Sequence, residues 1–305
     1  MHQMTSRRAV VRVPSGPRSI ETVTVPVAEP GPAEIRVKIA GAAINPVDLG
    51  VAGGVFHQLG LVHQPDYTGL GWDFAGTVEA AGPGVGLRLG TRVAGFIDGF
   101  DRDHGSHAEH LIAPAAHVAV VPDGMDLVEA ATVPLNATAA AQLADLLGEP
   151  SGTARRLLVT GAAGVVGAYV AVLARDRGWQ VTGMARAADE PFVRGLGAGF
   201  ATDAGQGWDA VADAGALQEN ALRAVRDGGR FVGVQPASRL PGERGITVEV
   251  LFARPDGALL APLLARAAAG ELPTRVHAVT PLDEAAGAYR AMAEGGVRGR
   301  IVLVP

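Results

Sequence analysis

The amino-acid sequence predicts an α/β protein in which a β-rich part is followed by a doubly wound parallel sheet. Three observations lead to this fold class. Short β-type segments separated by Pro and Gly fill the chain up to about Pro122. After Asp123, strand-like and helix-like segments alternate, as they do in a parallel sheet covered by helices. The length of 305 residues leaves room for two domains of ordinary size.

Each element follows from its local apolar pattern. The expected strands of the first part, typical of a barrel or sandwich, cover residues 9–13, 20–27, 34–44, 74–82, 91–97, 107–113 and 117–121. In the second part an Ala/Leu-rich helix is expected at 127–147, and strands are expected at 155–160, 180–185, 208–213, 229–234 and 246–252. A further helix is expected at 256–270, a helix start near Pro281 and a closing strand at 300–304.

Composition excludes several classes of function. The net charge is −5 and Lys and Arg form no dense run, so we expect no nucleic acid and no membrane as partner, but a small molecule. Cys is absent, which excludes disulfides, a thiolate nucleophile and Cys-bound zinc. The N-terminus lacks the apolar core of a signal peptide, and no apolar run reaches the roughly 20 residues of a membrane span. We therefore expect a soluble cytoplasmic protein.

A glycine-rich turn follows the strand expected at 155–160. Gly161, Gly164 and Gly167 punctuate it, and a helical pattern begins directly afterwards. Such a turn lets backbone N–H groups at a helix N-terminus approach a pyrophosphate, although Ala162 stands where the usual spacing has its first glycine. The alternative is a tight turn that binds nothing. We assign the pyrophosphate of a dinucleotide to Gly161, Ala162, Ala163, Gly164, Val165, Val166 and Gly167.

The end of the next strand predicts which dinucleotide is bound. NAD-binding sites usually carry Asp or Glu there to accept from the ribose hydroxyls. This chain has Ala185 and Arg186 instead, so no carboxylate repels a 2′-phosphate and the guanidinium can bind one. The alternative for Arg186 is a solvated surface residue. The predicted cofactor is NADPH.

Several longer motifs together resemble a known family. They are "AAINPVDLGVAGG" at 42–54, "GWDFAGTVEAAGPGV" at 71–85, "ATVPLNATAAAQL" at 131–143, "DGGRFVGV" at 227–234 and the terminal "GRIVLVP". The chain resembles the medium-chain dehydrogenase/reductase superfamily, in its zinc-independent quinone oxidoreductase and enoyl reductase branch. The resemblance implies a GroES-like catalytic domain at 1–122, a Rossmann domain at 123–270, a segment at 271–305 that returns to the first domain, and a homodimer.

This chain lacks residues that the zinc-dependent relatives use as metal ligands. Those relatives have Gly-His-Glu where this chain has Gly71-Trp72-Asp73, together with a cysteine that this chain lacks. The remaining candidates are His104, His107 and His110, which on a strand would spread over two faces and about 20 Å. We therefore predict no metal. A G-x-S-x-G motif is also absent, so a hydrolase has no nucleophile.

The resemblance also implies the site residues. It places Asn45 and Asp48 near nicotinamide and substrate, where Asn45 could donate its amide to a carbonyl oxygen and Asp48 would brace the site. The alternative for Asn45 is a turn-forming residue before Pro. Thr138 is expected to contact the cofactor, and the backbone of Val232, Gly233 and Val234 is expected to meet the nicotinamide carboxamide.

The sequence departs from the family at its usual proton donor. Relatives often carry Tyr, Arg and a second Tyr where this chain has Gly50, Ala52 and Phe56, which predicts a roomier pocket. His57 is the substitute candidate as proton donor, with His63, Asp66 and Tyr67 behind it and water as the alternative.

The predicted function is an NADPH-dependent reductase of an enone, an enoyl group or a quinone, with a bulky polyketide-like molecule as one possible substrate. Two alternatives stay open: a non-catalytic NADPH-binding sensor or structural protein, and a zinc-free NADP-dependent alcohol or carbonyl oxidoreductase.

Overall fold

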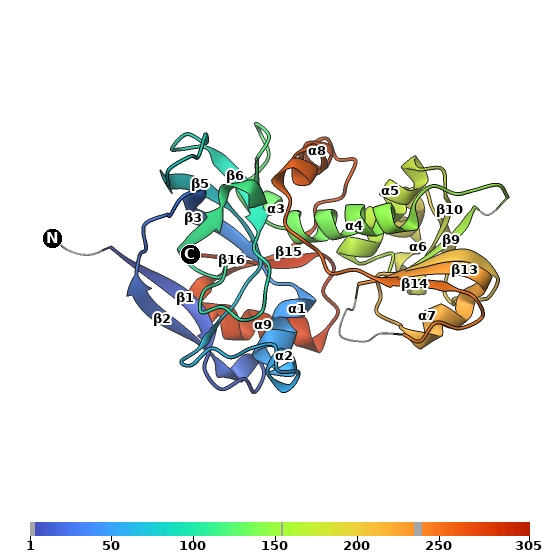
Figure 1. Cartoon of the computed structure of the whole chain (residues 1–305), viewed down its shortest axis with the longest axis horizontal. Helices are drawn as coiled ribbons and strands as arrows, with labels where there is room; N and C mark the ends of the chain where they lie inside the picture. The colour runs from blue at the N-terminus through green and yellow to red at the C-terminus, as the bar shows by residue number, and fades with distance from the viewer. Residues whose placement is uncertain (1–3, 154, 235–239) are drawn as a thin grey trace. The chain divides into compact units, whose positions relative to one another are not determined.

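The computed structural model describes residues 4–153, 155–234 and 240–305, and the chain divides into two compact units (Figure 1). The first unit contains residues 1–135 and 255–305, and the second contains residues 136–254. The second unit is thus inserted between the two segments that form the first.

Two sheets form the frame of the first unit. The small sheet has the order β2-β1-β4, with strands β1 (Thr5–Val11), β2 (Ile20–Pro26) and β4 (Thr68–Gly69). The larger sheet has the order β15-β16-β3-β5-β6-β8, and β7 also pairs with β3. Its strands are β3 (Glu34–Ala43), β5 (Asp73–Ala81), β6 (Arg92–Phe96), β7 (His110–Pro114), β8 (Val118–Val120), β15 (Val276–Pro281) and β16 (Arg300–Val304). Because β16 pairs antiparallel with β3, the end of the chain completes a sheet begun near its start.

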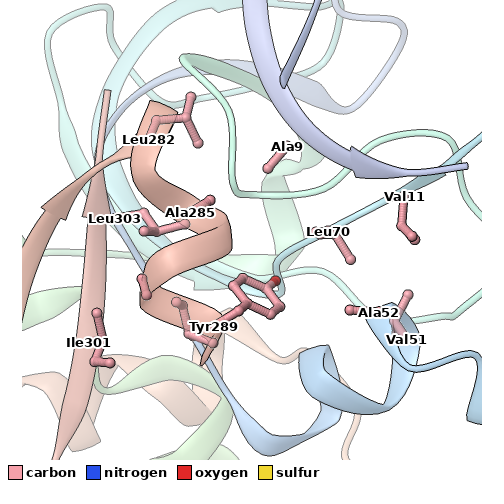
Figure 2. Close-up of a cluster of buried hydrophobic side chains, with 12 residues drawn as sticks. Ala9, Val11, Val51, Ala52, Leu70, Leu282, Ala285, Tyr289, Ile301 and Leu303 are labelled. Carbon is pink, nitrogen blue, oxygen red and sulfur yellow. The ribbon is translucent and has the colours of Figure 1, made fainter. Parts of the chain in front are cut away.

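Helices of the first unit pack against these sheets, as α8 (Gly257–Ala268) does on β8 and α9 (Ala285–Glu294) on β16. The unit also contains α1 (Pro46–Ala52), α2 (Val55–Gln58) and α3 (Leu127–Ala130). Helix α1 begins with a capping box, in which Asn45 and Asp48 bind each other's backbone N–H groups. Figure 2 shows how side chains from β1, α1, α9 and β16 meet in one buried cluster, with the ring of Tyr289 among them.

The second unit contains a six-stranded parallel sheet in its described part, with the order β11-β10-β9-β12-β13-β14. The strands are β9 (Arg156–Thr160), β10 (Gln180–Met184), β11 (Gly199–Ala201), β12 (Trp208–Asp213), β13 (Val225–Gly233) and β14 (Thr247–Val250). The helices are α4 (Pro134–Leu147), α5 (Val165–Asp176), α6 (Glu190–Gly195) and α7 (Glu219–Ala224). The order reverses between β9 and β12, and ligands of such sheets bind outside the carboxyl ends of the strands at this point.

The predicted fold class is confirmed, with differences in detail. Strand β11 was not predicted because three residues between glycine-containing turns are too short for a periodic signal. The predicted boundaries also move, since residues 123–135 and 255–270 were assigned to the nucleotide-binding domain but belong to the first unit. Residues 255–270 belong to the first unit because they contain α8, which packs on β8 of that unit.

Candidate functional site

The glycine turn of the second unit connects β9 to α5 through closely packed backbone. Gly161 follows β9 with a φ of 61°, and Gly164 precedes the first turn of α5. A Cβ on Gly167 would lie 2.3 Å from the carbonyl oxygen of Gly161, so only glycine fits there. The N–H groups in the first turn of α5, which begins at Val165, lack the intrahelical acceptors of later turns and lie at the positive end of the helix dipole, a place that favours anions.

A buried aspartate supports this turn from the neighbouring strand. Asp213 ends β12, is fully buried, and accepts hydrogen bonds from the Thr160 hydroxyl and from the N–H groups of Leu217 and Gln218. The Gly215 N–H in turn donates to the Thr160 oxygen at 3.0 Å. The loop after β12 is therefore tied to the strand that leads into the glycine turn. Sequence reasoning missed Asp213, although an acid closing an apolar strand was a usable signal.

Arg186 lies just beyond β10 and is exposed to solvent. In the part of the chain that the structure describes, it forms no ion pair. The Ala185 N–H beside it donates to the Ala201 carbonyl at 3.1 Å, which fixes the strand end. The guanidinium is thus open to an anion at the position where a dinucleotide ribose would lie.

The other two predicted cofactor contacts differ in their surroundings. Thr138 on α4 is fully buried, and its hydroxyl has no hydrogen-bond partner among the described residues. Such a group is normally satisfied, so it points to a ligand or a water. At the end of β13, the Gly233 carbonyl already accepts the Leu251 N–H at 2.7 Å, between buried Val232 and half-buried Val234. These cofactor roles stay predictions.

A buried polar network stands at the start of α1 in the first unit. We call Asn45, Asp48, Asp73 and Arg300 the polar network. Asn45 Nδ2 donates to Asp73 Oδ2 at 2.7 Å, and Arg300 Nε donates to Asn45 Oδ1 at 3.0 Å. The Asn45 N–H donates to Asp48 Oδ2 at 2.8 Å, and the Leu135 N–H donates to Asp73 Oδ1 at 2.6 Å. The network thus joins β3, β5, β16 and the start of α4.

The two carboxyl groups of the polar network are shifted in the same direction. Burial raises the pKa of Asp48 to about 7, against the lowering effect of the Asn45 N–H and the Arg102 charge. Burial likewise raises the pKa of Asp73 to about 7, against the N–H groups of Leu135 and Asn45. Each group therefore exchanges a proton near neutral pH inside a dry part of the molecule.

Asn45 and Asp48 are engaged within the protein. Besides its bond to Asp73, the Asn45 amide lies 3.4 Å from the Ala43 carbonyl, so its donors point into the network. Asp48 accepts the Gly71 N–H at 3.1 Å with its second oxygen. In this arrangement both residues fix the start of α1, and Asp48 also holds the backbone at Gly71. Direct contact of Asn45 with a substrate stays a prediction.

His57 lies on α2 and is half-buried. Its Nε2 is 3.2 Å from the Thr68 hydroxyl, and its Nδ1 has no hydrogen-bond partner among the described residues. Burial lowers the pKa of His57, with a smaller opposing effect from Asp101. The ring is therefore largely neutral at pH 7, and its role as proton donor stays a prediction.

The prediction of a roomier pocket at Gly50 and Ala52 was wrong. A Cβ on Gly50 would lie 2.9 Å from the ring of Phe56, which fills the space that the missing side chain leaves. Phe56 is itself stacked on Phe100, with ring centroids 3.8 Å apart. Ala52 is fully buried in the cluster of Figure 2. The small residues thus accommodate packing from within the unit.

Arg102 is a buried charge that sequence reasoning missed. Its guanidinium donates to the carbonyls of Gly99, His104 and Gly71 at 2.6–2.9 Å and lies over the Trp72 ring. Burial lowers the pKa of Arg102 to about 10, which leaves it charged at neutral pH. It therefore fixes the loop before His104 against the segment that precedes β5.

The three histidines of "HGSHAEH" have separate environments. His104 is exposed beside Asp103, and His110 Nε2 lies 3.4 Å from a Glu79 carboxylate oxygen. His107 is fully buried, with Nε2 3.2 Å from the Ala43 carbonyl and Nδ1 2.9 Å from the Tyr289 hydroxyl. Because Nε2 donates to the carbonyl, Nδ1 accepts the proton of the Tyr289 hydroxyl.

Tyr289→Phe is expected to lower the free energy of unfolding by about 1–3 kcal/mol, because it leaves the buried Nδ1 of His107 without its donor. Urea unfolding followed by circular dichroism measures this. The matched control is Tyr67→Phe, since Tyr67 is half-buried and its ring keeps the contact with Arg12. Equal stability of both variants would show that the hydrogen bond is not formed in solution.

Two family models match the chain. One, described as an alcohol dehydrogenase GroES-like domain, matches residues 31–123, and the other, described as a zinc-binding dehydrogenase, matches residues 187–303. Together they span parts of both units. No helix of the described residues is long and apolar enough to cross a membrane.

Individual proteins are similar over most of the chain. A mycocerosic acid synthase-like polyketide synthase of Mycobacterium tuberculosis is 29% identical over 99% of this chain, which spans only 16% of that protein. A 2-methylene-furan-3-one reductase of Solanum lycopersicum is 29% identical over 89% of this chain and 72% of its own length. The quinone oxidoreductase structure from Coxiella burnetii superposes with a TM-score of 0.86 over 99% of this chain and 100% of that one; at 21% identity this shows a shared fold.

The residues present do not fit the zinc that one model's description names. Trp72 has no ligating atom, and both oxygens of Asp73 accept hydrogen bonds from Asn45 and Leu135. The sequence has no Cys, and no group of three or more His, Asp or Glu residues suits a metal in the described part of the chain.

Proposed function

Because the chain belongs to the medium-chain dehydrogenase/reductase superfamily, we propose that it is an NADPH-dependent reductase of activated C=C bonds or quinones that works without a metal. The observation that carries the proposal is Asp73. By the resemblance, Asp73 stands where the zinc-dependent relatives have a glutamate. Its two carboxylate oxygens accept hydrogen bonds from Asn45 Nδ2 and from the Leu135 N–H at the start of α4. Chemistry that needs a Lewis acid at this position has no ligands, whereas hydride transfer to an electron-poor carbon needs none.

The relatives support the class of substrate. The tomato relative is named for a furanone that carries an exocyclic double bond next to a carbonyl group, which is an activated alkene. A protein of Penicillium oxalicum that is 34% identical over 44% of this chain is named as a trans-enoyl reductase. An enone or enoyl group is therefore the substrate class we propose, with quinones as further acceptors.

The second unit would hold the cofactor. The glycine turn would fit a pyrophosphate, because the missing Cβ of Gly167 lets the start of α5 pack closely on Gly161 and so keeps the first N–H groups of the helix at the turn. Arg186 fits the 2′-phosphate, Thr138 offers its buried hydroxyl, and the end of β13 offers backbone groups to the carboxamide. When bound, NADPH would supply the hydride for the electron-poor carbon of the substrate.

The first unit would orient the substrate and exclude water. Its polar network holds α1 rigidly on β3 and β16, which keeps the residues from Asn45 to Phe56 in one arrangement. A proton must also reach the substrate carbon next to the carbonyl. His57 or water would provide it, and the low proton occupancy of the half-buried His57 ring favours water at neutral pH.

Purified protein is expected to oxidise NADPH with a panel of enones, an enoyl thioester and quinones, and to leave simple ketones unchanged. Absorbance of NADPH measures the rate, and product analysis shows which bond is reduced. Tight NADPH binding without turnover of any acceptor would contradict the proposal and favour a sensor. Rapid reduction of ketones alone would favour the alcohol or carbonyl oxidoreductase.

Arg186→Ala is expected to weaken NADPH binding about tenfold or more, and to leave NADH binding nearly unchanged, because only NADPH carries the 2′-phosphate. Fluorescence titration of both nucleotides measures the two dissociation constants. Arg223→Ala, which removes another exposed arginine of the second unit, is the control. An unchanged preference in Arg186→Ala would remove this residue from the cofactor site.

A further inference from the structure

Residues 214–218, which we call the β12 loop, have a backbone conformation that side chains seldom adopt. Ala216 and Gln218 both have a φ of 55°, in the range that favours glycine. Gln218 combines this φ with a ψ of −117°, which lies outside the small left-handed region that other residues visit. A strained backbone of this kind persists only where the surrounding structure holds it, and such positions cluster at functional sites.

Asp213 holds the β12 loop from inside the unit. Its side chain is fully buried, although loop residues 215–217 are exposed. It accepts the Leu217 N–H at 3.0 Å and the Gln218 N–H at 2.7 Å, so it fixes the backbone at and directly before the more strained residue. The Thr160 hydroxyl donates to the same carboxylate. Because all three partners are donors, both oxygens of the side chain act as acceptors.

Thr160 connects the β12 loop to the start of the glycine turn. Its hydroxyl donates to Asp213 and accepts the Gly215 N–H at 3.0 Å. The backbones of Gly215 and Gly161 pack closely at the same place, since a Cβ on Gly161 would lie 2.8 Å from the Gly215 Cα. The Gly161 carbonyl oxygen in turn packs against Gly167 of α5. A shift of the β12 loop would therefore reach the glycine turn directly.

This pattern of donors explains why a carboxylate stands at the end of β12. An asparagine has one acceptor oxygen, and its NH2 group would face a donor that Asp213 now accepts. At least one of the N–H groups of Leu217 and Gln218, or the Thr160 hydroxyl, would then lose its acceptor. The strained backbone of the β12 loop would lose a bond that holds it.

We propose that Asp213 is a positioning residue for the dinucleotide: through the β12 loop it holds Gly161, and with it the glycine turn, in the conformation that receives the pyrophosphate. The inference rests on the proposed function, because it takes the glycine turn as the place where NADPH binds. Asp213 acts through backbone contacts, since its oxygens are occupied by Thr160, Leu217 and Gln218.

Amide hydrogen exchange of the chain without nucleotide tests the hold on the β12 loop. In the wild type, the N–H groups of Leu217 and Gln218 are expected to be protected, because their acceptor is buried. In Asp213→Asn they are expected to exchange about tenfold faster or more. Equal exchange in both proteins would overturn the proposal, whatever the affinity for NADPH.

Fluorescence titration with NADPH tests the effect on the glycine turn. Asp213→Asn and Thr160→Val are each expected to weaken binding about tenfold, and the double variant is expected to lose little more than either, since both side chains hold one loop. Adding Ala216→Gly to Asp213→Asn is expected to recover about threefold, because glycine adopts a positive φ without strain. A general loss of stability could not be reversed by a change in the loop.

Val211→Ala is the matched control, because it removes buried methyl groups from the same strand two residues before Asp213. It is expected to lower the stability of the unit, and to keep both the protection of the β12 loop and the affinity for NADPH. Circular dichroism checks that each variant is folded.

Three results of the titration would overturn the proposal. They are wild-type or tighter NADPH binding in Asp213→Asn, a loss of affinity in Val211→Ala as large as in Asp213→Asn, and no recovery when Ala216→Gly is added. No binding of NADPH by the wild type would contradict the proposed function and this inference together.

Discussion

Gly167→Ala is expected to weaken NADPH binding more than tenfold and to lower the free energy of unfolding by about 1–3 kcal/mol. The added Cβ would lie 2.3 Å from the Gly161 carbonyl oxygen and 2.7 Å from its carbon, so the turn and the start of α5 must move apart. That movement displaces the N–H groups expected to bind the pyrophosphate. Fluorescence titration with NADPH and urea unfolding measure the two effects.

Gly287→Ala is the matched control because it makes the same change inside another helix. Gly287 lies on the exposed side of α9, and a Cβ there would meet no atom within 4 Å. Alanine is the better helix former, so this variant is expected to gain about 0.5–1 kcal/mol of stability and to bind NADPH normally. NADPH affinity as high in Gly167→Ala as in the control would mean that the cofactor does not use this turn.

Asp73→Ala is expected to lower the free energy of unfolding by about 3–5 kcal/mol, because it removes a buried acceptor and leaves the nearby Arg300 charge less compensated. Asn45 Nδ2 and the Leu135 N–H would both lose the oxygen to which they donate. The reductase rate should fall as well, since α1 loses its anchor on β5. Urea unfolding and the NADPH oxidation rate measure the two effects.

The pH dependence of stability provides a second test of the same residue. The pKa of Asp73 is about 7 in the folded chain and 3.8 in an unfolded one, so the folded state holds the proton more tightly. Its contribution to stability is therefore greatest below about pH 4, falls as the pH rises towards 7, and is constant above that. The advantage of the wild type over Asp73→Asn should be larger at about pH 5 than at about pH 8. An equal difference at both pH values would show that Asp73 ionises normally in the fold.

Much of the fold could be predicted because it depends on local patterns. The alternation of apolar residues placed β3, β5 and β6 within a residue or so, and the glycine turn placed β9 and α5. Strand β4 was missed because two residues form no pattern, and its pairing with β1 is a tertiary event. The boundary at Pro255 was missed because it depends on which surface α8 packs against.

The candidate site could be predicted less well, because its residues meet through contacts that are distant in sequence. The motif containing Asn45 and Asp48 was visible, but Arg300 lies 255 residues after Asn45 and no local pattern joins them. Arg102 and Tyr289 belong to no motif that the sequence analysis used, and only their burial in the structure shows their roles. The space at Gly50 was misjudged for the same reason, since its occupant Phe56 arrives from the next helix.

The insertion of one unit within the other has a consequence for biosynthesis. Residues 136–254 form a unit that is continuous in the chain, and this unit is fully translated before the ribosome reaches β15. The first unit is completed later, because β3 gains its partner β16, and Asn45 gains Arg300, only after residues 300–304 have been translated. A nascent chain stalled before residue 300 would therefore present a complete second unit attached to an unpaired edge of β3, and unpaired strand edges promote aggregation.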